Sequence, residues 1–266
     1  MLATVSGIIA VALYLSGTWF QSQTLFHDRD LKRLVKICGW TALLAHGISM
    51  LYVINSPLGY NFGFFKISSV FSFTISGLIL ISSLKKSVEN LFLLIFPIAM
   101  VSILCSLFVP SDYTPHQNYS FGLALHIVLA ILATSIITIA AIQAVFMAYE
   151  NQQLKQKHHF SLIRHLPPLE TMESLLFAFI WLGILLLSAV IVTGIMYTDD
   201  FLGQSLSHKT VFSICSWVVF AVLLWGRHQS GWRGSTALRW TLTGFGFLIL
   251  AYFGSKFVLE LILNRA

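Results

Sequence analysis

Charged side chains are scarce in this sequence. Only 10% of its 266 residues are Asp, Glu, Lys or Arg, whereas 57% are hydrophobic and the mean hydropathy is +0.82. A soluble protein would have to bury several apolar runs longer than ordinary globular helices, so this composition excludes a soluble domain and indicates a multi-pass membrane protein. The apolar runs contain no carboxylate pair of the kind that proton-coupled transporters use, which disfavours a transporter.

Cysteine patterns and catalytic motifs are missing as well. The three cysteines, Cys38, Cys105 and Cys215, lie in different apolar runs, without C-x-x-C, C-x-x-C-H or zinc-site spacing, so we interpret them as buried small hydrophobic residues. The sequence also lacks G-x-S-x-G, H-E-x-x-H and a phosphate-binding glycine loop. We therefore expect a protein that is not an enzyme.

Long apolar segments are what the sequence does contain. Their number predicts an all-α, polytopic integral membrane bundle of about eight transmembrane helices that forms a single domain over residues 1–266. The predicted spans cover residues 4–25, 34–55, 65–84, 89–109, 120–149, 174–197, 210–226 and 237–262.

The basic residues alternate between the connections, which predicts the topology. Connections after the first, third, fifth and seventh spans carry most of the Lys and Arg, whereas those after the second, fourth and sixth contain Asp112, Asp199 and Asp200. By the positive-inside rule the basic connections are cytoplasmic, so both termini are expected on the outer, periplasmic face. The net charge of +6 is therefore a topology signal, and the lipid bilayer rather than nucleic acid is the expected partner.

His126 is the first candidate site residue. It lies near the start of about thirty residues, 120–149, without a formal charge, which would span roughly 45 Å as a helix. With the fifth span running inward, His126 is expected roughly 9 Å below its outer end. A ring at this depth is either a hydrogen-bonded interfacial histidine or a ligand, for example to haem iron, and His116 and His208 fall in outer connections on the same face.

His46 is expected roughly 18 Å along the second span, near the middle of the membrane. No charged residue lies within nine positions of it, so the ring needs a partner inside the bundle. Two interpretations remain open from the residues alone: a functional role, or a hydrogen bond to a Ser or Thr of a neighbouring span.

A series of motifs follows Ser120. It consists of His126 with its span, Leu166-Pro167-Pro168-Leu169-Glu170-Thr171-Met172-Glu173, Gly194, Lys209 eight residues before Trp217, Gly231-Trp232-Arg233-Gly234, and Ala251-Tyr252-Phe253-Gly254-Ser255. In this series the sequence resembles the cytochrome c assembly family of haem-handling membrane proteins (CcsA, CcmC and YpjD-like), with greatest similarity to the short, eight-span YpjD-like branch. The resemblance covers a little over half the chain strongly and includes His46 in the weaker first four spans.

The resemblance implies a helical bundle in the bacterial inner (cytoplasmic) membrane that presents b-type, non-covalent haem at the outer face, held by histidine pairs. His126 would be the first outer iron ligand and His46 the first membrane ligand. Where the family has its second membrane histidine, this sequence has Trp225, with His228 about one turn later. Other cytochrome c assembly or membrane proteins are the implied partners.

Two features depart from the family pattern. The tryptophan-rich WWD haem platform expected before Lys209 is replaced by residues 196–208, which contain no Trp, and no histidine follows the last span up to Ala266. The sequence therefore predicts a protein that binds or relays haem rather than one that attaches it. A haem-free membrane scaffold or accessory subunit is the alternative, and a small-solute or ion transporter is a third hypothesis.

Overall fold

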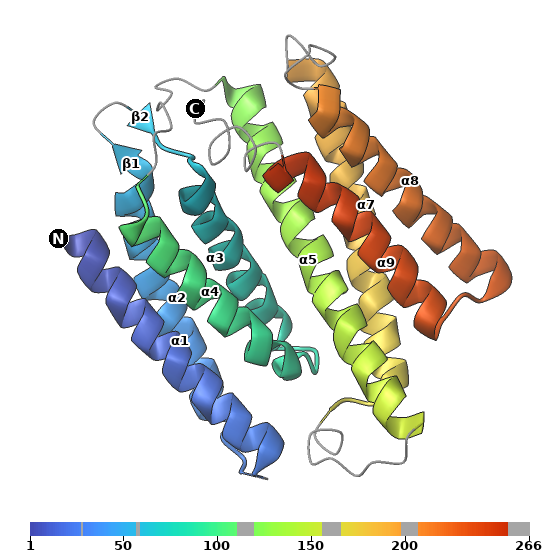
Figure 1. Cartoon of the computed structure of the whole chain (residues 1–266), viewed down its shortest axis with the longest axis horizontal. Coiled ribbons are helices and arrows are strands. Elements are labelled where there is room, and N and C mark those ends of the chain that lie inside the picture. Colours follow the sequence, from blue (N-terminus) through green and yellow to red (C-terminus); the bar gives the residue numbers. More distant parts are fainter. Residues whose placement is uncertain (28, 57–58, 111–119, 156–165, 198–206, 255–266) are drawn as a thin grey trace. The chain divides into compact units, whose positions relative to one another are not determined.

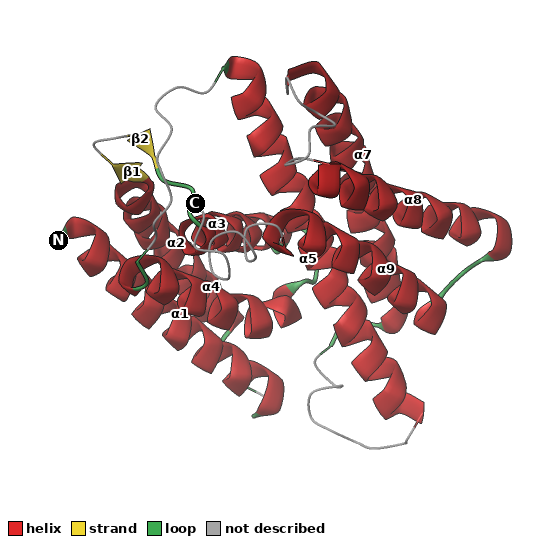
Figure 2. Ribbon diagram, turned by 45° about the horizontal axis from the view of Figure 1, so that its top comes forward, coloured by secondary structure: helices red, strands yellow, loops and turns green. Residues whose placement is uncertain are grey.

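The computed structural model of the chain describes residues 1–27, 29–56, 59–110, 120–155, 166–197 and 207–254 (Figure 1). Nearly all of these residues are helical. The helices are α1 (Leu2–Phe26), α2 (Lys32–Ile54), α3 (Phe64–Ser82), η1 (Glu89–Leu91), α4 (Phe92–Phe108), α5 (Phe121–Lys155), α7 (Leu169–Tyr197), α8 (Ser207–Ser230), α9 (Gly234–Ile249) and the π-helical η2 (Leu250–Gly254). The strands described are β1 (Asn55–Ser56) and β2 (Gly59–Tyr60), an antiparallel pair at the end of α2 (Figure 2).

Eight of these helical segments are long and apolar enough to cross a membrane. They confirm the eight spans predicted from sequence, with shifts of a few residues at most ends. The sixth span begins at Leu169 rather than at residue 174, and the seventh continues to Ser230 rather than ending at 226. Pro97 does not interrupt α4, which is helical on both sides of it.

The chain forms two compact units. Unit 1 contains Met1–Asn118, His159–Pro167 and Ala266, and unit 2 contains Tyr119–His158 and Pro168–Arg265. Unit 1 therefore holds α1 to α4, and unit 2 holds α5 to α9 with η2. The single domain over residues 1–266 stays a prediction.

In unit 1, α1 packs along α2 and α4, and α3 packs against α4 and α2. Glycines permit the close approach of these helices. A Cβ atom on Gly7 would lie 2.6 Å from Leu107 Cδ1, and one on Gly39 would lie 2.8 Å from Leu80 Cδ2. The interior of unit 1 is polar for a membrane bundle, because α3 turns Ser69, Ser72 and Ser76 inward and the Ser72 hydroxyl hydrogen-bonds that of Ser102 on α4.

In unit 2, α5 packs along the length of α7 and also contacts α9, while α8 packs against α9. The small residues at spacing four on α5 that predict close packing include Ala140 and Ala144, and both are fully buried. On the facing helix, a Cβ atom at Gly183 would lie 2.7 Å from Ile137 Cγ1. Small residues thus let the α5 and α7 backbones approach closely, as is common in membrane bundles.

The turn between α8 and α9 depends on two glycines. Gly231 and Gly234 have φ angles of +63° and +54°, the left-handed region that other residues rarely adopt. Between them, Trp232 folds back so closely on Gly226 that a Cβ there would lie 2.4 Å from its indole. This local geometry explains why glycines bracket Trp232 and Arg233.

Candidate functional site

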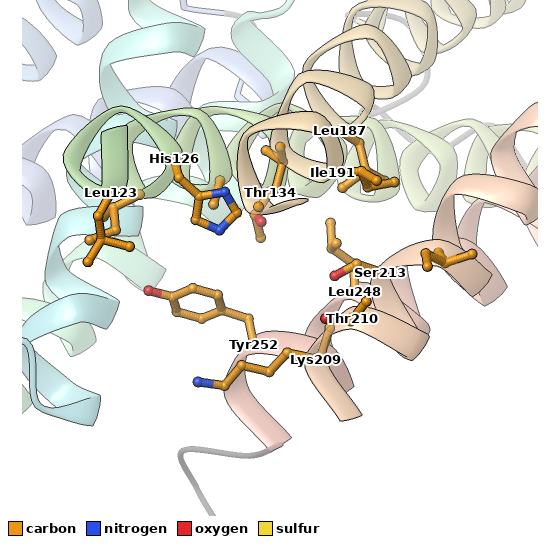
Figure 3. Close-up of a pocket in the computed structure, with 16 residues that line it drawn as sticks. Leu123, His126, Thr134, Leu187, Ile191, Lys209, Thr210, Ser213, Leu248 and Tyr252 are labelled. Atoms are coloured by element: carbon orange, nitrogen blue, oxygen red, sulfur yellow. The ribbon is translucent and has the colours of Figure 1, made fainter. Parts of the chain in front are cut away.

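His126 enters a pocket of unit 2 from the first turns of α5. Its side chain is half-buried, and Figure 3 shows the imidazole directed from α5 into the pocket. The pocket measures about 270 Å³, slightly below the roughly 300–1,000 Å³ typical of small-molecule sites. His126 is therefore a ring at the wall of a cavity rather than one packed into the core.

Thr193 on α7 is the side-chain partner of His126. The Thr193 hydroxyl donates to the backbone carbonyl of Ala189 at 2.8 Å, so its oxygen is available to accept. His126 Nδ1 lies 3.1 Å from that oxygen, and we assign the proton of the ring to Nδ1. In this assignment Nε2 carries the lone pair through which a neutral histidine binds a metal.

The walls of the pocket are mostly apolar and come from four segments. Besides His126 they consist of Leu123, Ile127, Ala130 and Thr134 from α5, Leu187, Val190, Ile191 and Gly194 from α7, Lys209, Thr210, Ser213 and Ile214 from α8, and Leu248, Ala251 and Tyr252 from α9 and η2. Such a lining, mostly apolar with a few convergent polar groups, is typical of a small-molecule or cofactor site.

The polar side chains of Lys209 and Tyr252 lie across the pocket from His126. Figure 3 shows the Tyr252 ring facing His126 across the pocket, with Lys209 beside it. Tyr252 belongs to η2, where the helix widens to π geometry, a feature that often occurs at functional sites. An ammonium and a phenol at one edge suit the carboxylates of a ligand.

The far end of unit 2 is held together by Glu173, which is 5% exposed. Its carboxylate lies 2.6 Å from Nη1 of Arg227 and accepts from Nε of Arg233 at 3.1 and 3.2 Å. Arg227 also stacks over the Phe177 ring, 4.7 Å from its centroid. These contacts connect α7, α8 and the start of α9, the elements that also form three walls of the pocket.

His46 lies at the centre of unit 1 and is fully buried. Its Nε2 is 2.9 Å from the Ser69 hydroxyl on α3, which is the serine contact that one interpretation of the sequence predicted. The rings of Tyr14 and Phe73 contact it edge-on, with centroids 6.0 and 5.5 Å away. Nδ1 has no hydrogen-bond partner among the described residues. As described, the ring is enclosed by side chains that would have to move before a macrocycle could reach it.

The other candidate ligands do not join this pocket in the described part of the chain. Trp225 is 64% exposed and His228 is also exposed, and both lie toward the opposite end of α8 from Lys209. Sixteen to nineteen helical residues separate them from Lys209, roughly 24–28 Å. His116 and the side chain of His208 lie outside the described residues. The ligand roles of all four stay predictions.

Sequence reasoning missed Thr193 and the pocket role of Tyr252. Thr193 is 67 residues from His126, and a threonine in an apolar helix carries no local signal of such a contact. Trp217, which belongs to the motif series, does not line the pocket, and its indole donates to Ser188 Oγ at 2.8 Å. The sequence therefore predicted His126 as a candidate ligand but not the residues that surround it.

Comparison with known proteins adds independent information. A sequence profile of the family described as "Cytochrome C assembly protein" matches residues 34–263. The chain is 29% identical over 264 residues to the inner membrane protein YpjD of Escherichia coli K12, covering 98% of both chains. No solved structure shows significant similarity to it.

Two other relatives match over shorter regions. Protein HemX of Brevibacillus brevis is 24% identical over 164 residues, 59% of this chain and 60% of that protein. The cytochrome c biogenesis protein CcsA of Gloeobacter violaceus is 28% identical over 93 residues, 34% of this chain and 28% of that protein.

Proposed function

The chain belongs to the cytochrome c assembly protein family, and from this membership we propose that it binds haem non-covalently in the unit 2 pocket lined by His126. The observation that carries the proposal is the position of His126, which lines this pocket with its Nδ1 3.1 Å from the Thr193 hydroxyl oxygen. With the proton of the ring assigned to Nδ1, His126 would hold haem iron through the lone pair of Nε2.

The other residues of the pocket fit the same group. Apolar walls from α5 and α7 suit the faces of a porphyrin, and Lys209 and Tyr252 would hold its carboxylates at one edge. A bound haem supplies an iron centre that is handed on as cargo or changes its oxidation state. The task of this chain is to hold the group, to orient it through His126 and Thr193, and to shield it from lipid.

The activity we propose is haem handling rather than haem attachment. Residues 196–208, where the family resemblance implies a tryptophan-rich platform, contain no Trp, and the chain has no catalytic motif of its own. The protein is a multi-pass membrane protein, and its similarity over 98% of its length to an inner membrane protein supports placement in a bacterial inner membrane. The distribution of basic residues supports both termini on the outer face.

A haem-free scaffold is the second candidate function. The observation that favours it is the enclosure of His46 by Tyr14, Phe73 and Ser69, which leaves no described cavity beside the predicted membrane ligand. In this reading the bundle keeps its helices and its internal contacts, and it assembles with other membrane proteins without haem.

Absorption spectra of detergent-purified protein, oxidised and reduced, decide between the two. Protein expressed with ample haem should carry haem bands, and His126→Ala should lose them, whereas His228→Ala, which removes an exposed histidine of α8, should keep them.

Replacing His116 or His208 in the same assay identifies the second ligand, because loss of the low-spin signal with rescue by imidazole marks a missing histidine ligand. A colourless wild-type protein would contradict the haem proposal and favour the scaffold function.

A further inference from the structure

A second cavity, of about 230 Å³, lies in unit 1 where several of its helices end. It is lined by Gln21, Thr24 and Leu25 at the end of α1, Lys32 at the start of α2, Ser87, Glu89 and Asn90 ahead of α4, and Leu166 with Pro167. Because these are the ends of membrane spans, the cavity lies at the level of the lipid headgroups. Neither His46 nor any other predicted haem ligand lines it.

Two buried amides in its wall have polar atoms without partners. Asn90 is 3% exposed, and neither Oδ1 nor Nδ2 of its side chain has a hydrogen-bond partner among the described residues. Gln21 is 2% exposed, and its Oε1 is unpartnered in the same part of the chain. An unsatisfied buried polar atom destabilises the fold, so three of them in two residues that line one cavity point to a missing ligand.

Charged groups complete the lining. Glu89 is held at the cavity by Lys36, whose Nζ lies 3.0 Å from Oε1 of Glu89 and donates to the Ser83 carbonyl at 2.9 Å. Lys32 is exposed at the edge and brings a second cation. The cavity lining therefore includes an anionic group, Glu89, and a cationic group, Lys32.

The unpartnered atoms specify the chemistry of the occupant. Gln21 Oε1, Asn90 Oδ1 and the Glu89 carboxylate all accept, so they call for a group with several N–H donors, which a primary ammonium provides. Asn90 Nδ2 and the Lys32 ammonium donate, so they call for an anion. The cavity is far larger than the about 10–15 Å³ of such space that one water needs.

We propose that this cavity binds a phosphoethanolamine group, with its ammonium toward Gln21, Asn90 and Glu89 and its phosphate toward Lys32. Its position at the ends of the spans points to a membrane lipid, phosphatidylethanolamine, as the source. Unit 1 is then a lipid-binding module whose ligand stabilises the helix ends, independently of any haem in unit 2.

Lipid binding to the delipidated full-length protein in detergent tests this, by native mass spectrometry and by the shift in thermal unfolding. Phosphatidylethanolamine should bind about tenfold more tightly than phosphatidylcholine with the same acyl chains, because the methylated ammonium has no N–H to donate. It should also raise the unfolding temperature, since a ligand that binds only the folded state stabilises it. Soluble phosphoethanolamine should have little effect.

Gln21→Leu and Asn90→Leu should abolish the preference for phosphatidylethanolamine. The lipid-free variants should fold at least as well as the wild type, because each substitution removes unsatisfied buried atoms. Gln23→Leu, in the same last turns of α1 but outside the cavity lining, is the matched control and should keep the preference.

Three results would overturn the proposal. Equal binding of the two lipids means that the headgroup is not recognised. Equal stabilisation by soluble phosphoethanolamine means that the ligand is not a lipid. No stabilisation by any of the three means that water alone fills the cavity.

Discussion

Arg233 and Glu173, sixty residues apart, meet at one end of unit 2, where the guanidinium Nε of Arg233 donates to both oxygens of the Glu173 carboxylate. Each belongs to a motif that carries the family resemblance, Glu173 to the Pro-Pro-Leu-Glu-Thr-Met-Glu stretch and Arg233 to Gly-Trp-Arg-Gly. Arg227 approaches the same carboxylate more closely, at 2.6 Å. One motif thus supplies the carboxylate and the other a guanidinium of an ionic contact that holds α8 and α9 against α7.

Glu173→Gln should destabilise the protein, because it leaves two arginines beside a buried position without their counter-charge. Since Arg227 and Arg233 keep partial access to water, with side chains 35% and 61% exposed, we expect a loss of about 1–3 kcal/mol rather than the larger cost of a fully buried pair. Thermal unfolding in detergent measures it. Glu170→Gln, which changes an exposed carboxylate in the first turn of α7, should leave the unfolding temperature unchanged.

Arg227→Gln should cost more than Arg233→Gln. Arg227 is the closer and less exposed partner, and it also loses its contact with the Phe177 ring. The opposite order would show that the Gly231–Gly234 turn, rather than the carboxylate, determines the stability of this end.

The sequence alone predicted the spans well, because a helix that crosses a bilayer needs about twenty apolar residues and this requirement is local. The sequence predicted the sixth span from residue 174, whereas α7 begins at Leu169 and includes Glu170 and Glu173. It did not predict that Glu173 pairs with Arg233, because contacts between distant segments depend on the packing of helices. The short β1–β2 pair was missed for a related reason, since two residues per strand form no period-two pattern.

The candidate site was predictable only in part. A histidine near the end of an uncharged span needs a partner, and this argument identified both His126 and His46. It could not distinguish them, although one lines a cavity and the other is enclosed by aromatic rings. The difference arises from Thr193 and Tyr252 on one side and from Tyr14 and Phe73 on the other, which come from other helices.

The topology is testable by reporter fusions at Gln156 and Ala266. The basic residues of the connection after the fifth span place Gln156 in the cytoplasm, and eight spans then place Ala266 outside. A reporter active only in the periplasm should therefore respond at Ala266 and not at Gln156. The same response from both positions would contradict the eight-span topology.

Thr193→Val should weaken haem binding without removing the iron ligand. Valine keeps the shape of threonine but cannot accept the Nδ1 proton of His126, so the ring loses the contact that orients it. We expect roughly tenfold lower haem affinity, within the 10–100-fold cost of such second contacts in metal sites. Titration with haem in detergent measures it.

Thr193→Ser is the matched control for this prediction, because serine retains the hydroxyl. It should bind haem within about twofold of the wild type, a difference of less than 0.5 kcal/mol. Equal affinity of the valine and wild-type proteins would mean that His126 is oriented by packing alone.

His46→Ala should destabilise unit 1, since it removes a fully buried ring between Tyr14 and Phe73. The expected loss is about 2–4 kcal/mol, as for other large-to-small core substitutions, whereas Ser69→Ala should cost only about 1 kcal/mol. If the family's membrane haem site exists here, the haem content of His46→Ala also falls while that of Ser69→Ala does not. Unchanged stability and haem content in His46→Ala would show that the ring is neither packed nor ligated as we infer.

Lys209→Met should remove the preference of the pocket for a ligand with free carboxylates. If Lys209 and Tyr252 hold the propionates of haem, the wild type should bind haem about tenfold more tightly than haem dimethyl ester, in which both carboxylates are neutral. Lys209→Met should lower the affinity for haem to that for the ester and leave ester binding unchanged, and Lys209→Arg should restore the preference, since it keeps the charge. Measuring the affinity of each variant for both ligands separates loss of the carboxylate contact from misfolding, because a misfolded pocket binds neither ligand.

If the wild type binds haem and its dimethyl ester equally while His126→Ala binds neither, the iron contact is supported and the proposed role of Lys209 is wrong.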